Sequence, residues 1–208
     1  MNIPAKFGFY AVLTDPIKGY EYLTKLLVDN ETAFVQLRMK NASLYEIEKV
    51  AHMMKKITEG TKTRFIVNDH PDIVMKTDAD GVHIGQDDQP YEKVRALLGP
   101  DKIIGVSTHS PLQTELACKK SPDYIGVGPV FPTPTKKNPD PVIGLEGMEE
   151  MLKRATVPAV CIGGIDLQSL ADVLKAGGEN FCMVRQLTQS DDPQKVLDKI
   201  SEICSGSL

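Results

Sequence analysis

Short apolar runs recur along the whole chain, each followed by an amphipathic stretch, and they constrain the fold more than any other feature. The runs are apolar at both even and odd positions and rich in Val and Ile, as expected for parallel strands covered on both faces. They span residues 8–15, 33–39, 64–69, 81–86, 102–108, 124–130, 158–164 and 180–184. Strands that alternate with helices in this way predict an α/β fold.

The stretches between these runs have helical periodicity. Between residues 43 and 60, one helical face collects Leu44, Ile47, Ala51, Met54 and Ile57. Ser43 with Glu46 forms the sequence signature of a capping box, and Ser110 with Gln113 forms a second one. Asp166 can cap the helix that follows the seventh run. These signals predict where three of the helices begin.

Two architectures can hold eight such units: an open doubly wound sheet and a closed (β/α)₈ barrel. The chain has 208 residues, which matches the lower end of the size range of these barrels. The glycine fingerprint of dinucleotide-binding sheets, G-x-G-x-x-G, is missing after the first run. No long linker or low-complexity tract interrupts the pattern. We therefore predict one TIM-barrel domain over residues 1–208.

Composition narrows the class of partners. A net charge of -4 argues against a nucleic-acid binder or a polybasic membrane partner. The first residues lack the apolar run of a signal peptide, and no stretch of about 18 apolar residues occurs. The four cysteines form no C-x-x-C pair, and Cys161 and Cys182 lie inside apolar runs. We expect reduced, structural thiols and a cytoplasmic protein. Whether it forms a homo-oligomer stays open.

The ends of the runs are the places to look for chemistry, because barrel active sites lie at the carboxyl ends of the strands. Nearly every run ends in a polar residue or a glycine. These residues are Thr14, Asp15, Gln36, Arg38, Asn68, Asp69, Gln86, Asp87, Asp88, Ser107, Thr108, Gly163, Gly164 and Arg185. Such a concentration predicts an active-site rim.

Two segments are suited to binding phosphate. Residues 131–144 form the longest irregular stretch, and loops of this length are often functional. Its hydroxyls and cations are Thr133, Thr135, Lys136 and Lys137. Gly163 and Gly164 end the seventh run, where backbone N–H groups can approach an anion. The alternatives are a solvated basic loop and a tight turn that needs glycine.

Two carboxylates suggest a magnesium site. Asp69 ends the third run, and Asp88 follows the fourth, which is its neighbour in a barrel. Mg²⁺ is typically held by one or two carboxylates together with substrate phosphates. Asp87 is equally acidic, and spacing alone does not choose between it and Asp88. His83 is best interpreted as a buried, hydrogen-bonded histidine. No cluster of Cys and His has the spacing of a zinc site.

The order of these elements resembles one family. YAVLTD, VQLRMK, VNDHPDI, ADGVHIGQDD, GVSTHS, DYIGVGPVFPTPTKK and VPAVCIGGI follow one another as in thiamine-phosphate synthases, from residue 10 to about residue 190. This family has a (β/α)₈ barrel. It joins the diphosphate of 4-amino-5-hydroxymethyl-2-methylpyrimidine to thiazole phosphate, giving thiamine phosphate and pyrophosphate. The resemblance therefore implies a transferase of thiamine biosynthesis that acts on small phosphorylated substrates.

The resemblance also implies roles for residues at the ends of the second, third and fifth runs. Gln36 and Ser107 match positions that contact the pyrimidine. Arg38, Lys40 and Asn68 match positions that hold its diphosphate.

The metal and phosphate positions follow in the same way. Asp69 and Asp88 match the Mg²⁺ ligands of the family, which favours Asp88 over Asp87. Thr133, Thr135 and Lys136 match the two hydroxyls and the lysine that meet phosphate. Catalysis would then rest on Arg38, Lys136 and Ser107, with no strong general base.

The chain departs from the family pattern at two positions. Met39 stands where an acid is common, and Arg185 stands where a small serine-like residue is common beside the thiazole phosphate. We expect Arg185 to contact that phosphate, together with the backbone N–H of Gly163 or Gly164. The alternatives to a synthase are a thiazole tautomerase relative, another phosphate-binding barrel enzyme and a non-catalytic paralogue that binds thiazole phosphate.

Overall fold

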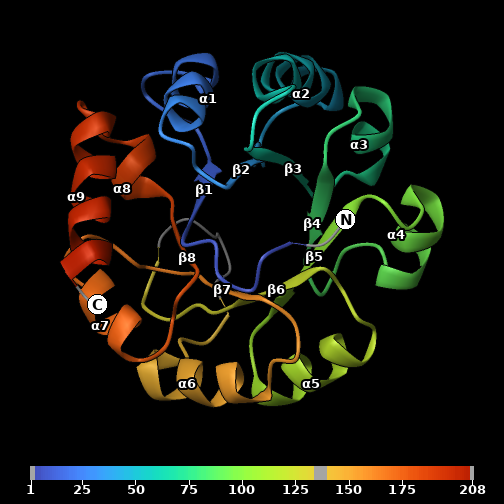
Figure 1. Cartoon of the computed structure of the whole chain (residues 1–208). Helices are drawn as coiled ribbons and strands as arrows, with labels where there is room; N and C mark the ends of the chain where they lie inside the picture. The colour runs from blue at the N-terminus through green and yellow to red at the C-terminus, as the bar shows by residue number, and fades with distance from the viewer. Residues whose placement is uncertain (1–2, 134–139, 207–208) are drawn as a thin grey trace.

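Eight parallel strands form a closed barrel in the computed structural model of the chain, which describes residues 3–133 and 140–206 (Figure 1). They are β1 (Phe9–Leu13), β2 (Phe34–Leu37), β3 (Arg64–Asn68), β4 (Gly81–Ile84), β5 (Ile103–Thr108), β6 (Tyr124–Val127), β7 (Ala159–Cys161) and β8 (Phe181–Met183). Each strand pairs with the next, and Tyr10 of β1 pairs with Cys182 of β8. This closure confirms the barrel and excludes the open sheet.

Helices form the outer ring around the strands (Figure 1). Those within the described residues are α1 (Tyr20–Asp29), α2 (Leu44–Thr58), α3 (Pro71–Thr77), α4 (Tyr91–Leu98), α5 (Pro111–Lys119), α6 (Gly144–Arg154), α7 (Leu170–Lys175), α8 (Arg185–Thr188) and α9 (Pro193–Gly206). The strands lie inside the eight predicted runs. One helix was expected after β8, but the structure has two, the short α8 and then α9.

Two hydrophobic compartments follow from the period-2 alternation of the strands. Side chains on the outer face of the sheet pack against the helices and form the larger core. Side chains on the inner face fill the barrel and form the smaller core. Its buried members are Tyr10, Val12, Phe34, Ile66, Ile103, Tyr124, Val160 and Cys182. All four cysteines are free, as expected, and Cys118, Cys161 and Cys182 are buried.

The predicted helix starts are largely confirmed. Ser43 and Glu46 form a complete capping box at α2. Ser110 accepts a hydrogen bond from the Gln113 N–H, but the Gln113 side chain bonds the N–H of His109 and so does not close a second box.

Two expectations about helix residues differ from the structure. Leu44 was expected on the buried face of α2 but is 55% exposed, and it is the first residue of that helix. Asp166 accepts from the N–H groups of Gln168 and Ser169, so it caps the turn just before α7 and not the helix itself, whose N-cap is Ser169.

None of the helices within residues 3–133 and 140–206 combines the length and the apolar character needed to span a bilayer.

Candidate active site

The carboxyl ends of β2, β3 and β4 bring several predicted residues together. Asn68 is the last residue of β3 and pairs with His83 of β4. Asp69 follows it with a φ of 63°, a left-handed conformation that Asp tolerates better than most residues. Its N–H donates to the His83 carbonyl at 2.8 Å, which fixes this conformation. The turn after β3 therefore holds the Asp69 carboxylate at the mouth of the barrel.

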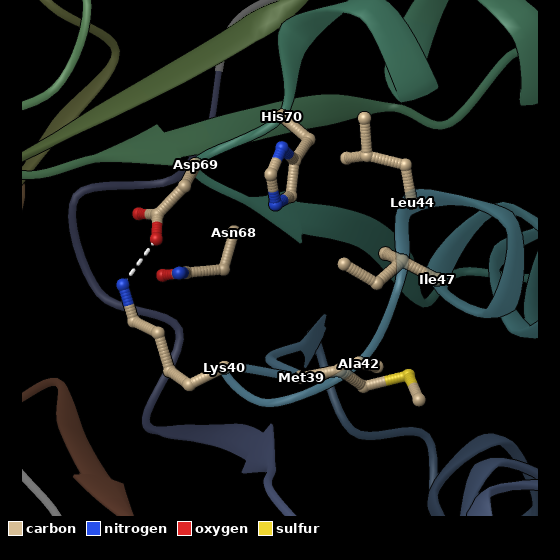
Figure 2. Close-up of a pocket in the computed structure, with 8 residues that line it drawn as sticks. All are labelled: Met39, Lys40, Ala42, Leu44, Ile47, Asn68, Asp69 and His70. Atoms are coloured by element: carbon tan, nitrogen blue, oxygen red, sulfur yellow. Dashed lines mark hydrogen bonds and ion pairs between the residues drawn. The ribbon is translucent and has the colours of Figure 1, made fainter.

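Lys40 forms an ion pair with Asp69 at this mouth (Figure 2). Asn68 points its amide toward the same pair, and the side chain of Met39 points away from it (Figure 2). These residues line a cavity of about 280 Å³ that His70 borders on the β3 side. Met39 packs against the outer core. Met39, at which the sequence departs from the expected pattern, therefore faces away from the ion pair.

Arg38 adds a second cation beside the same carboxylate. Burial lowers the pKa of its guanidinium, against the attraction of the Asp69 and Asp15 carboxylates. The Arg38 N–H donates to the Leu13 carbonyl at 3.0 Å, so the backbone after β2 remains tied to β1. A half-buried cation near two carboxylates is suited to a small anion that enters from solvent.

Asp88 lies next to Asp69. Burial raises the pKa of the Asp88 carboxyl, and the adjacent Asp69 carboxylate raises it further, against the hydrogen bond from the Gly85 N–H. That N–H donates to Asp88 Oδ2 at 2.6 Å and holds the side chain over the end of β4. Asp87 is exposed. The fold therefore places Asp88, and not Asp87, beside Asp69, a choice that residue spacing left open.

Two adjacent carboxylates are a partial site for a hard cation. In the described part of the chain no three His, Cys, Asp or Glu side chains cluster so as to hold a metal ion. Mg²⁺ does not need such a cluster, because it binds through one or two carboxylates and completes its shell with water and substrate phosphates. Asp69 and Asp88 therefore fit Mg²⁺ bound together with a diphosphate.

A chain of hydrogen bonds crosses the barrel interior, buried at Gln36, Tyr10 and Tyr124 and half-buried at His83 and Ser107. Gln36 Nε2 donates to the Tyr10 hydroxyl at 3.0 Å, and the Tyr10 and Tyr124 hydroxyls are 2.7 Å apart. His83 Nδ1 lies 3.0 Å from the Tyr124 hydroxyl, and its Nε2 lies 2.8 Å from Ser107 Oγ. The chain joins the predicted site residues Gln36 and Ser107 through the barrel interior. Neither tyrosine was predicted from the sequence, although their place on the inner face of β1 and β6 was a signal for them.

The remaining predicted residues lie around β7 and β8. Gly163 and Gly164 both have positive φ, and a Cβ on Gly164 would lie 2.5 Å from the Pro132 carbonyl oxygen. Close packing therefore requires glycine at positions 163 and 164, whether or not their backbone N–H groups also bind a phosphate. Arg185 is exposed at the first position of α8. Thr133 is half-buried.

Thr135 and Lys136, which are predicted to bind phosphate, lie outside the described residues, and so does Lys137.

These features define the class: a (β/α)₈ barrel protein with a charged site at the carboxyl ends of its strands. The sequence model of the family described as thiamine monophosphate synthase matches residues 10–187. The thiamine-phosphate synthase of Caldicellulosiruptor bescii is 40% identical over 181 residues, covering 87% of this chain and 83% of that protein. That of Lawsonia intracellularis is 39% identical, covering 86% and 83%. The chain belongs to the thiamine monophosphate synthase family.

A solved structure gives the same result at the level of the fold. The thiamine phosphate pyrophosphorylase of Pyrococcus furiosus is similar to this chain with a TM-score of 0.87 and 29% sequence identity. The likeness covers 98% of each chain. The whole barrel, including the strand ends that carry the site, is therefore shared with that protein.

Proposed function

We propose that this chain joins 4-amino-5-hydroxymethyl-2-methylpyrimidine diphosphate to thiazole phosphate, producing thiamine phosphate and pyrophosphate. The observation that carries the proposal is the set of charges at one end of a barrel of this family. Arg38 and Lys40 lie beside Asp69, and Asp69 lies beside Asp88. Two cations and two acids at one point match a diphosphate that arrives with a divalent cation.

In this proposal the two ends of the hydrogen-bond chain hold the pyrimidine ring. Gln36 and Ser107 carry the amide and the hydroxyl suited to an aminopyrimidine, and both are anchored by their neighbours. The Asn68 amide and the Lys40 and Arg38 cations bind the diphosphate. Lys40 would exchange its present partner, Asp69, for diphosphate oxygens when substrate enters.

Asp69 and Asp88 would hold Mg²⁺, which would supply positive charge to the leaving diphosphate. Arg38 and Lys136 would add to that charge from the protein. The displacement would be dissociative: the bond between the pyrimidine methylene carbon and the diphosphate oxygen breaks first, and pyrophosphate leaves with the bonding electrons. The electron-rich aminopyrimidine bears the resulting cation, and the thiazole nitrogen then forms a bond to that carbon. This nitrogen carries no proton to remove, so the site needs no strong general base.

The second substrate would bind across the mouth. Thr133, Thr135 and Lys136 are the side chains proposed for its phosphate, together with the Gly163 or Gly164 N–H. Arg185 would add a charge-assisted contact from the start of α8. The protein then holds the nucleophilic nitrogen in line with the breaking bond.

The test is pyrophosphate release by the purified protein from the two substrates, with Mg²⁺ and with a chelator. Release that requires both Mg²⁺ and thiazole phosphate is expected. A folded protein that binds thiazole phosphate but releases no pyrophosphate would contradict the proposal and favour a non-catalytic paralogue.

A further inference from the structure

The hydrogen-bond chain has a property that its separate bonds do not have: each donor fixes the direction of the next bond. Gln36, Tyr10 and Tyr124 are 4%, 2% and 1% exposed, so water does not replace their partners. A hydroxyl donates a single proton and a neutral imidazole carries one. One end of such a chain therefore constrains the other.

The direction can be followed from the Gln36 end. Gln36 Nε2 donates to the Tyr10 hydroxyl, and with that bond made the single Tyr10 proton is left for the Tyr124 hydroxyl, 2.7 Å away. If Tyr124 then donates to His83 Nδ1, 3.0 Å away, a neutral imidazole carries its proton on Nε2 and donates it to Ser107 Oγ, 2.8 Å away. In this arrangement Gln36 presents its carbonyl oxygen as an acceptor beyond the chain, and Ser107 presents its O–H as a donor.

The opposite arrangement needs every bond to reverse together. If the Gln36 amide turned over, its oxygen would accept from Tyr10, and the imidazole proton would move to Nδ1. Ser107 would then donate into the chain and present only an acceptor beyond it. The donor and acceptor characters of Gln36 and Ser107 are thus coupled through Tyr10, Tyr124 and His83.

Two glycines in the strands leave the space that the rings of this hydrogen-bond chain occupy. A Cβ on Gly105 of β5 would lie 2.1 Å from Cζ of Tyr124, so the tyrosine ring occupies the space of the missing side chain. Gly126 of β6 faces His83, with 3.4 Å between its ideal Cβ and the ring. The backbone carbonyl of Ser107 is held separately by Gln86 Nε2 at 2.5 Å.

We propose that Tyr10, Tyr124 and His83 form a relay that sets the hydrogen-bond polarity of Gln36 and Ser107, so that the site selects a 4-aminopyrimidine over its 4-oxo counterpart. The inference rests on the proposed function, in which these two residues bind the pyrimidine. A 4-aminopyrimidine offers an amino donor beside a ring-nitrogen acceptor, and the 4-oxo form offers the reverse. Tyr10, Tyr124 and His83 are positioning residues that act through Gln36 and Ser107.

Tyr124→Phe tests the relay by removing one hydroxyl and keeping the ring. The measurement is the Kd of the 4-amino and 4-oxo pyrimidine diphosphates, by calorimetry with Mg²⁺ and without thiazole phosphate. The wild-type protein should bind the 4-amino compound more tightly by about tenfold or more. In Tyr124→Phe this ratio should fall by about tenfold, because each end can then turn independently. The KM for thiazole phosphate should stay within about twofold.

Two further variants complete the design. Tyr10→Phe removes the bonds of the Tyr10 hydroxyl to Gln36 and Tyr124 and should also lower the ratio of the two Kd values. It replaces Tyr124→Phe as the test if that variant does not fold. Tyr91→Phe is the matched control. Tyr91 begins α4, outside the barrel, and its hydroxyl donates to the Ser121 carbonyl and to no relay residue. It should leave both Kd values unchanged.

The outcomes separate the relay from the proposed function. Folded Tyr124→Phe or Tyr10→Phe protein with an unchanged ratio would overturn the relay. So would wild-type protein that releases pyrophosphate yet binds both compounds equally. Wild-type protein that binds both with the expected preference but releases no pyrophosphate would contradict the synthase activity alone. Protein that binds neither compound would overturn both.

Discussion

Replacing Gly105 by alanine should damage the barrel interior far more than one methyl group normally does. The new Cβ would lie 2.1 Å from Cζ and 2.4 Å from the hydroxyl oxygen of Tyr124. Non-bonded carbon atoms need about 3.5 Å or more, so the ring has to move by over about 1 Å. The ring is 1% exposed and enclosed by Tyr10 and Phe34, which leaves it little space.

The magnitude follows from three contributions. Overpacking a core costs about 1–3 kcal/mol. Moving the Tyr124 hydroxyl away from Tyr10 and His83 costs about 1–3 kcal/mol more. Replacing glycine lowers the entropy of the unfolded chain, which restores about 0.4–1 kcal/mol, and Gly105 has no positive φ that would add strain. The free energy of unfolding should fall by about 1–5.6 kcal/mol, a large part of a typical 5–15 kcal/mol.

Urea unfolding measures this change, and the chain offers a matched control. Gly126 lies on the neighbouring strand and faces the same interior, but its added Cβ would meet His83 at 3.4 Å. Gly126→Ala should cost less than about 1 kcal/mol. In a Tyr124→Ala background the clash is absent, so Gly105→Ala should be nearly neutral there.

Two results would refute this reasoning. One is a loss below about 1 kcal/mol for Gly105→Ala. The other is the same loss in the presence and absence of the Tyr124 ring, because a direct clash must produce a coupling between the two positions of at least about 1 kcal/mol.

Three variants test the charged site by pyrophosphate release. Lys40→Met should raise the KM for the pyrimidine diphosphate about ten- to hundredfold, because a charge-assisted contact is lost. The KM for thiazole phosphate should stay within about twofold. Equal effects on the two KM values would contradict a diphosphate role for Lys40. Asp88→Asn should raise the Mg²⁺ concentration for half-maximal activity at least about tenfold, whereas Asp87→Asn, at an exposed position, should not. Equal Mg²⁺ curves for the two variants would reject Asp88 as a ligand. Arg185→Ser should raise the KM for thiazole phosphate about five- to tenfold, and an unchanged KM would remove Arg185 from the site.

The fold could be predicted because its signal is local and repeated. Each run of β-branched and apolar residues is a strand buried on both faces, and eight repeats separated by helices leave few architectures. The strand-end residues could be predicted for a related reason. In parallel strands every carboxyl end lies on the same side of the barrel, so chain order alone gathers Gln36, Arg38, Asn68 and Asp69 there.

The predictions that failed depended on where elements end in space. Leu44 fits the helical face by period but is the first residue of α2 and is exposed. Gln113 has the spacing of a capping box, yet its side chain reaches the His109 N–H. Periodicity predicts to which side of the helix a residue points, but not whether another strand or helix packs against that residue.

The sequence by itself determined the barrel, the family and the identity of the residues at the strand ends, since these follow from short-range patterns and their order. The family resemblance already favoured Asp88 over Asp87, but only the tertiary structure showed that Asp88 lies beside Asp69 and that Met39 faces away from Lys40. It also decided that Tyr10, Tyr124 and His83 connect Gln36 to Ser107. These residues come from five different strands, and side-chain contacts across a barrel depend on its closure and stagger, which no single strand encodes.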